Sequence, residues 1–129
     1  MIDNEDYYVN MVTKAIRAKY PKAEIVSEYV PKPSRFPHIY IRETDNSTHL
    51  AAYTLSGKEP LANVSYTVDV YSNSKERKKS ICKDIIAIID TVMLSEYFYR
   101  VMCNPFPNEN DATIYRIIAR YNKIDKERN

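Results

Sequence analysis

The eight residues VSYTVDVY at positions 64–71 indicate the fold class of this chain. Valine or tyrosine occupies each even position, and serine, threonine and aspartate stand between them. Alternation with a period of two is typical of a β-strand that buries one face against a core. We therefore expect a strand here, with Asp69 on the opposite face together with Thr67 and Tyr71.

Two amphipathic helices flank this central strand. The first is expected close to the N-terminus, between a capping pair formed by Asp3 and Asp6 and the helix-stopping Pro21. The second is expected after the capping residues Asn73 and Ser74. Apolar residues recur every three to four positions in both segments, which predicts one core-facing stripe on each helix. The stripes comprise Tyr8, Met11, Val12, Ala15 and Ile16 in the first helix and Ile81, Ile85, Ile88, Ile89 and Val92 in the second.

β-branched and aromatic residues predict four more strands, the last two forming a hairpin across a turn-rich connection. The expected strands cover 25–30, 38–43, 97–103 and 113–123, and the expected loops cover 31–37, 47–61 (with a short strand near 50–55) and 104–108. The order α-β-β-β-α-β-β predicts a two-layer α+β domain spanning 1–129. Its sheet is mainly antiparallel or mixed, has about five strands and is covered on one face by the two helices. A charged, flexible tail is expected from about 124 to 129.

Composition limits the possible functions. The chain has 129 residues, a single glycine and a formal net charge of +2. So small a charge does not imply nucleic-acid binding by bulk attraction, and glycine-cradled phosphate loops are excluded. The longest nearly apolar run, Ile85–Leu94, is too short for a membrane span. The acidic start resembles no secretory signal, so a reducing cytoplasm is the expected environment.

The residues that could support catalysis are scattered along the chain. Cys82 and Cys103 match no redox or zinc spacing, and a Cys–His dyad is geometrically open but is supported by no motif. His38 and His49 do not fall at the spacing of a metal-binding pair. We therefore expect a protein that is not an enzyme and that has neither metal nor cofactor.

Several polar residues are candidates for contacts with partners. Asp69 lies either on a solvated strand face or against an arginine of a neighbouring subunit. Arg116 and Arg120 alternate with core residues, so they should point toward solvent, a subunit or DNA. Cations at the start of the second helix oppose its dipole, which indicates either a partner or merely a soluble helix start. The complete set of interface candidates is Asp69, Tyr71, Lys75, Arg77, Lys78, Arg116, Arg120, His49, Tyr53 and Phe36.

Four segments resemble those of the small tail-terminator or minor capsid proteins of tailed phages and prophages of Gram-positive bacteria. They are 36–40 (FPHIY), 68–73 (VDVYSN) with the following lysine-rich helix start, 83–94, and the hairpin 104–121 (NPFPNENDATIYRIIARY). The resemblance covers nearly the whole chain in order, and the expected element order agrees with the α+β fold of that family.

The resemblance implies a structural role in the virion, at the head–tail junction. Such proteins form a sixfold ring on the tail tube, stop its polymerisation and dock the head connector, leaving a channel through which genomic DNA passes. The implied partners are other copies of this chain, the tail tube protein and the head connector or stopper protein, with no membrane. The loops 31–37 and 47–61 are the expected contacts to tube or connector. The host cytoplasm is the expected site of assembly.

Two alternatives remain open. A head-completion or stopper protein of the same connector would have the same composition. A small regulatory domain that binds nucleic acid would use the basic residues 75–79 together with Arg116 and Arg120, and its affinity would fall steeply with salt.

Overall fold

The computed structural model describes residues 1–50, 61–108 and 111–128. Two helices and five strands follow one another in the predicted order, and the expected α+β class is confirmed. Their bounds are α1 Glu5–Lys19, β1 Glu24–Val26, β2 His38–Thr48, β3 Ala62–Ser72, α2 Lys78–Ser95, β4 Tyr99–Phe106 and β5 Tyr115–Asp125.

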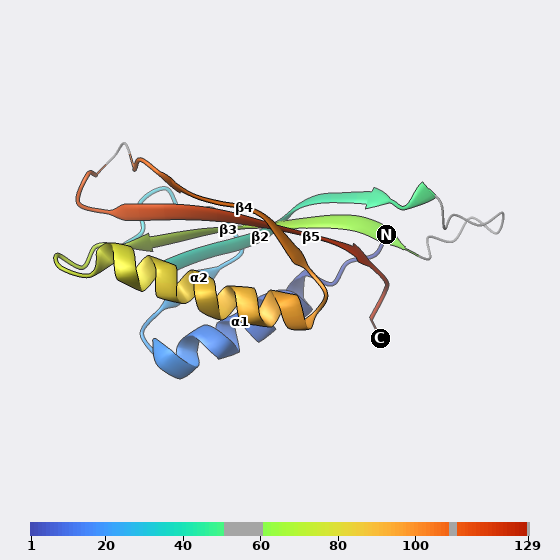
Figure 1. The fold of residues 1–129 in the computed structure, drawn as a ribbon, viewed down its shortest axis with the longest axis horizontal. Helices are drawn as coiled ribbons and strands as arrows, with labels where there is room; N and C mark the ends of the chain where they lie inside the picture. Colours follow the sequence, from blue (N-terminus) through green and yellow to red (C-terminus); the bar gives the residue numbers. More distant parts are fainter. Residues whose placement is uncertain (51–60, 109–110, 129) are drawn as a thin grey trace.

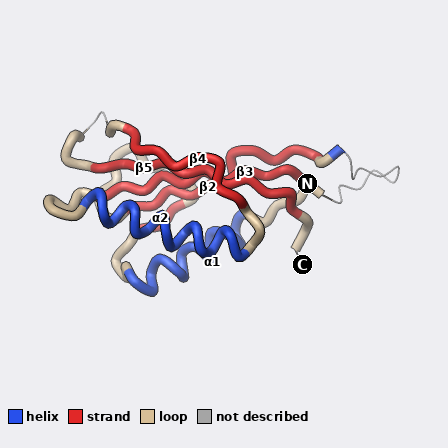
Figure 2. Tube along the Cα trace, in the orientation of Figure 1, coloured by secondary structure: helices blue, strands red, loops and turns tan. Residues whose placement is uncertain are grey.

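The strands form one mixed sheet in the order β1-β2-β3-β5-β4. Strand β1 runs parallel to β2, and all other neighbours are antiparallel. Both helices lie on the same face of the sheet (Figure 1). In the described part of the chain, no helix lies on the opposite face (Figure 2). We call this opposite surface the open face.

The core lies between the helices and the sheet. Val64, Tyr66, Val68 and Val70 of β3 are all buried there, as the alternation predicted. From α1, Tyr8, Val12 and Ile16 complete this layer, and Tyr8 packs edge-on against Tyr66 with ring centroids 5.4 Å apart. On β5, Ile117, Ala119 and Tyr121 face the helices, so the predicted assignment of faces on this strand is confirmed.

The stripe of α2 is rotated relative to the prediction. Its buried residues are Cys82, Ile85, Ile86, Ile89 and Met93. The predicted Ile81, Ile88 and Val92 are only partly buried. Apolar residues surround most of this helix, so periodicity alone does not determine which side faces the sheet.

Several element boundaries differ from the prediction. The strand predicted over 38–43 is longer in the structure: β2 continues to Thr48 because a shift in register after Glu43 accommodates the additional residue Thr44. Helix α2 begins at Lys78 rather than after Asn73 and Ser74. The Ser74 Oγ atom accepts the Arg77 N–H at 3.3 Å, which forms a turn before the helix. Residues 104–106, expected in a turn, belong to β4.

The expected tail from residue 124 is instead attached to the body of the protein. Strand β5 continues to Asp125, which is buried. The Asn4 amide nitrogen donates to the Asp125 carboxylate at 3.0 Å and to the Lys126 carbonyl at 2.8 Å. The Arg128 N–H donates to the Asn4 side chain at 3.3 Å. These bonds join the two ends of the described chain.

The short strand expected near 50–55 falls almost wholly outside the described residues. The described edges of this connection continue the pairing of β2 and β3, since the His49 N–H donates to the Leu61 carbonyl at 3.1 Å. Neither described helix combines the length and apolarity needed to cross a bilayer.

Candidate functional site

The open face carries a cluster of charged and aromatic side chains from three neighbouring strands. Tyr40 of β2 lies in register with Asp69 of β3, and Asp69 lies in register with Ile118 of β5. Arg42 and Arg116 reach Asp69 from the rows on either side. We call Tyr40, Arg42, Asp69, Tyr71 and Arg116 the Asp69 cluster.

Asp69 is only 1% exposed although no helix covers it. Arg42 donates through Nη1 to its Oδ1 atom at 2.5 Å. Arg116 donates to Oδ2 through Nε at 3.1 Å and through Nη2 at 2.6 Å. A buried carboxylate requires such charge-assisted bonds, because desolvation otherwise makes its ionised form unfavourable. The two interpretations of Asp69 are thereby corrected: it is not solvated, and its arginine partners come from its own chain.

Two tyrosines hold the arginines in place. The Arg42 guanidinium lies 4.2 Å from the centre of the Tyr40 ring, and that of Arg116 lies 5.5 Å from the centre of the Tyr71 ring. Such cation–π contacts restrict guanidinium groups that would otherwise move freely. One carboxylate faces two guanidiniums, so the cluster has a net charge of +1.

Arg120 lies on the same face but outside the cluster. Thr67 separates it from Arg42 in the sheet register. Its Nη2 atom donates to the Ser65 hydroxyl at 3.2 Å, and its buried Nε atom has no hydrogen-bond partner among the described residues. No carboxylate forms an ion pair with Arg120 in the described part of the chain.

A pocket of about 560 Å³ adjoins the cluster. Its walls come from the proline-rich loop after β1 and from the β4–β5 connection, and Tyr71 and Arg116 contribute to its lining. Tyr29 and Phe106 supply exposed rings on opposite sides. The pocket therefore combines aromatic walls with one cation of the Asp69 cluster.

The basic residues before α2 are only partly within the helix. Lys75 and Arg77 are exposed and precede its first residue, whereas Lys78 begins it. The ammonium of Lys78 donates to the Thr113 carbonyl at 3.3 Å, near the tip of the β4–β5 hairpin. The argument from the helix dipole therefore applies to Lys78 and not to the residues in the preceding turn.

The remaining interface candidates are not brought together. His49 follows the last residue of β2, and its Nδ1 atom lies 3.0 Å from the Asn63 side-chain oxygen. Phe36 precedes the first residue of β2 and lines a separate pocket beside Pro21 and Lys22. Because β2 runs between them, His49 and Phe36 lie at opposite ends of the sheet. Tyr53 lies outside the described residues.

Two carboxylates of α2, Asp84 and Asp90, are only partly exposed. Asp84 accepts the Tyr20 hydroxyl at 2.5 Å and the Lys19 ammonium at 2.7 Å, and both bonds lower its pKa. Asp90 accepts the Tyr121 hydroxyl at 2.5 Å. These carboxylates fix α2 against α1 and the sheet, a structural role that the sequence did not reveal.

The cysteines and histidines do not converge. Burial raises the pKa of the Cys82 thiol to about 12, so this thiol is unreactive at neutral pH. The Nδ1 atom of buried His38 lies 2.8 Å from the Glu24 carboxylate. Within the described ranges, no group of three or more histidine, cysteine, aspartate or glutamate residues is arranged to hold a metal ion.

Sequence reasoning missed Arg42 and Tyr40. The alternation of 38–43 does place both residues opposite Ile39 and Ile41, which could have drawn attention to them. It does not show that β2 pairs with β3 in the register that brings Arg42 to Asp69.

Comparison with known proteins adds no family assignment. No protein-family model matches the chain, and no curated protein matches it significantly.

Proposed function

We propose that this chain is a structural protein of a phage or prophage virion, of the tail-terminator class. Copies of it would form a sixfold ring on the tail tube at the head–tail junction. The ring would stop tube polymerisation, dock the head connector and leave a channel for DNA. The proposal rests on the resemblance of four segments to that family together with a fold of the expected element order.

The observation that favours a contact role over catalysis is the open face. It is rich in tyrosine and arginine, the side chains that contribute most to protein interfaces. The Asp69 cluster is already held by its own hydrogen bonds, so its donors are ordered before any partner arrives. Preorganised side chains lose little entropy on binding, which favours recognition.

A ring needs two different complementary patches on each subunit, because neighbouring copies meet head to tail. The open face with its net positive cluster is one candidate patch, and the exposed cations Lys75 and Arg77 before α2 are another. Both are cationic, so each would need an acidic or apolar patch of the neighbouring copy as its complement. A stopper protein of the same connector would use similar surfaces, and its position in the particle would distinguish it.

Electron microscopy of purified tails tests the proposal. Deleting the gene from the parent phage should give tails of irregular length and heads without tails, because nothing halts the tube. Supplying the wild-type gene in trans should restore uniform tails. Particles of normal length and infectivity from the deletion would overturn the proposal. Recovery of the protein on filled heads that lack tails would favour the stopper assignment.

A nucleic-acid-binding domain is the second candidate function, and the architecture of the open face favours it. Single strands bind sheets on which aromatic rings stack and arginines contact phosphate. Tyr40 and three arginines share this face, whereas Tyr71 is buried there and cannot stack on a base. This alternative predicts affinity for single-stranded DNA that falls steeply with salt, and loses about one unit of salt slope in Arg120→Gln. A ring subunit predicts weak or no binding by the isolated chain.

A further inference from the structure

Strand β4 is the longer of the two sheet edges. In the described structure β4 pairs with β5 on one side only, whereas the other edge strand, β1, has three residues. The outward backbone N–H and C=O groups of an edge strand can pair with a strand of another protein. Edge strands of natural proteins often contain features that hinder such pairing. Strand β4 contains two of them, a register shift after Arg100 and the proline Pro105. Between these two features, its outer edge has no partner strand in the described structure.

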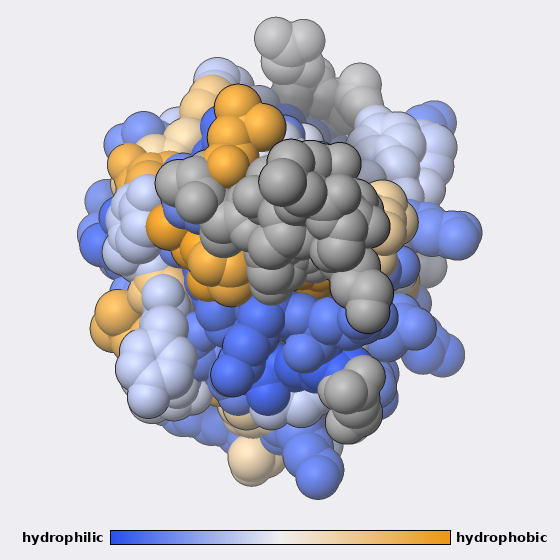
Figure 3. All heavy atoms as spheres, turned by 90° about the vertical axis from the view of Figure 1, so that its right-hand side faces the viewer, coloured by the Kyte–Doolittle hydropathy of each residue, from blue (hydrophilic) through white to orange (hydrophobic). Residues whose placement is uncertain are grey.

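Exposed apolar side chains gather where β4 begins. Leu94, Tyr97, Tyr99 and Val101 are all exposed, and they lie within eight consecutive positions. Seen from the end of the molecule at which both termini lie, hydrophobic residues are grouped in the upper part of the view and hydrophilic residues lie mainly below them (Figure 3). Contiguous exposed apolar residues next to a free edge are typical of a contact site.

Tyr97 has a backbone conformation that does not suit tyrosine. Its φ is +68°, the left-handed region that glycine usually occupies at the end of a helix. The Tyr97 N–H donates to the Leu94 carbonyl and the Phe98 N–H donates to the Met93 carbonyl, so this turn closes α2. The side chain is 84% exposed and gains little from the fold. The left-handed conformation costs free energy for tyrosine, and no contact of its side chain within the described structure compensates for it. A contact with another molecule best explains why tyrosine occupies this position.

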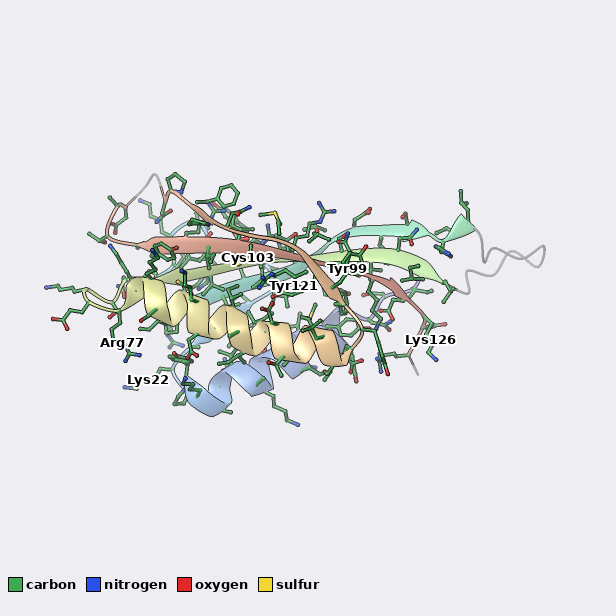
Figure 4. All side chains as sticks on the ribbon, in the orientation of Figure 1. Lys22, Arg77, Tyr99, Cys103, Tyr121 and Lys126 are labelled. Carbon is green, nitrogen blue, oxygen red and sulfur yellow. The ribbon has the colours of Figure 1, made fainter. Side chains whose placement is uncertain are left out.

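A groove runs between α2 and β4. It has a volume of about 390 Å³, and Ile86, Cys103 and Ile117 contribute its apolar lining. Its cations are Lys79, Lys83 and Arg100. Figure 4 shows Cys103 on β4 above α2, with Tyr121 beside it.

Cations outnumber carboxylates along this groove. Of the described residues, Asp90 is the one carboxylate in its lining, and it is already bonded to the Tyr121 hydroxyl and, at 2.6 Å, to Arg100. No carboxylate forms an ion pair with Lys79 or Lys83 among the described residues. The rim therefore favours an acidic occupant, and the apolar lining favours the aliphatic part of a glutamate side chain.

We propose that the β4 edge and this groove bind an extended segment of a partner protein in which apolar residues alternate with carboxylates. Alternation sends successive side chains of a strand in opposite directions. The groove lies on the helix-covered side of β4, where Cys103 is in register with Ala119. The carboxylates of the segment therefore meet the two lysines of the groove there. The apolar set then lies on the other side of β4, beside Tyr99. The backbone of the segment pairs with the open edge of β4, and Tyr97 and Tyr99 contact its end. The inference goes beyond the proposed function, because it holds whatever structure the partner belongs to.

The native thiol of Cys103 provides a direct test. Cys103 is partly exposed in the groove, whereas Cys82 is buried, so a disulfide reagent should modify Cys103 first. A short synthetic peptide of alternating valine and glutamate should slow this modification in proportion to its occupancy. It should also protect β4 amides from hydrogen exchange. A valine–lysine peptide and a valine–glutamate peptide interrupted by proline should do neither.

Charge reversal tests the basic rim. Lys83→Glu should weaken binding of the valine–glutamate peptide by about tenfold, because it replaces attraction by repulsion at the groove. Lys14→Glu, an equally exposed change on α1, should leave the affinity unchanged. Equal effects of both substitutions would reduce the interaction to bulk charge and overturn the inference. Tighter binding of single-stranded DNA than of the peptide would also overturn it.

Tyr97→Gly separates binding from folding. Glycine relieves the left-handed backbone, so the variant should melt at a higher temperature than the parent. The same variant should bind the peptide about fivefold more weakly, because a tyrosine anchor is lost. Tyr29→Gly, which removes an exposed tyrosine from another loop, should leave peptide affinity unchanged. Unchanged affinity in Tyr97→Gly would contradict the role given to this residue.

Discussion

Strand β3 sends Val68 to the helix-covered face of the sheet and Asp69, the next residue, to the open face, and both side chains are at most 1% exposed. Val68 is buried by apolar residues of the helices. Asp69 is buried by two arginines and two tyrosines of the sheet itself. One face is thus covered by a second layer of structure, and the other covers its own charge with long side chains. This comparison shows that burial alone does not identify the side of a sheet that faces the core.

The largest loss of stability is expected from a substitution on the helix-covered face of the sheet. Ile85→Ala removes a fully buried side chain and should lower the free energy of unfolding by about 3 to 4 kcal/mol, through lost transfer energy and the cavity left behind. Urea denaturation monitored by circular dichroism measures it. Ile124→Ala, at an exposed position of β5, is the matched control and should change stability little. Similar losses in both variants would contradict the assignment of the core.

A single substitution of a polar residue on the open face should lower the free energy of unfolding nearly as much. Asp69→Ala leaves two guanidiniums facing each other without a carboxylate and should lower the free energy of unfolding by about 3 kcal/mol. Asp45→Ala, an exposed carboxylate on β2, should stay close to the parent. The same denaturation experiment compares them. A loss below that of the control would show that the Asp69 cluster does not support the fold.

A smaller and pH-dependent loss of stability is expected from a substitution at Asp125, where the two ends of the described chain meet. Burial alone would raise the pKa of Asp125, but hydrogen bonds from Asn4 and Tyr8, together with the Lys123 charge and the Lys126 N–H, outweigh it and hold that pKa below its usual value. A lowered pKa stabilises the fold above the unfolded value of about 4, and this stability is lost as the pH falls through the folded value. Asp125→Asn should therefore cost about 2 kcal/mol at pH 7.

The acid limb of the stability curve checks this expectation. The parent should lose stability below about pH 4 more steeply than Asp125→Asn, because only the parent has this carboxylate to protonate. The difference between the two proteins should therefore shrink as the pH falls. Parallel curves would mean that Asp125 has the same pKa in the folded and unfolded chains.

The smallest change in stability is expected at Arg120, and it can be compared with the change at Arg116 on the same strand. Among the described residues, Arg120 has a buried Nε without a partner and no paired carboxylate, so Arg120→Met should change the free energy of unfolding by less than about 0.5 kcal/mol. Arg116→Met removes both bonds to the Asp69 Oδ2 atom and should cost about 2 kcal/mol. Thermal unfolding compares the pair. Equal losses would place Arg120 in a stabilising role that its contacts do not show.

The element order could be predicted because each element follows from a local pattern. These patterns depend only on residues that are close in sequence. Examples are the alternation of 64–71, the helix-ending Pro21 and the apolar stripe of α1. The ends of elements were harder to predict. The extension of β2 past 45 depends on pairing with β3, and the start of α2 depends on a turn closed by Ser74.

The candidate site could be predicted only in part, because its contacts are distant in sequence. Asp69, Tyr71 and Arg116 were recognised as residues off the core, and the structure brings them together. Arg42 is separated from Asp69 by 27 positions, and no local pattern indicates that they meet. Nor could the anchoring of Asp125 by Asn4, across 121 positions, be read from a charged segment.

The strand order also affects how the protein can be made. Strand β5 lies between β3 and β4 although it leaves the ribosome after both. Strand β4 therefore emerges without its neighbour, and its tyrosines and apolar residues are exposed until β5 inserts beside β3. The sheet can be completed only after β5 has emerged, so its folding should depend on protection of β4 during that interval.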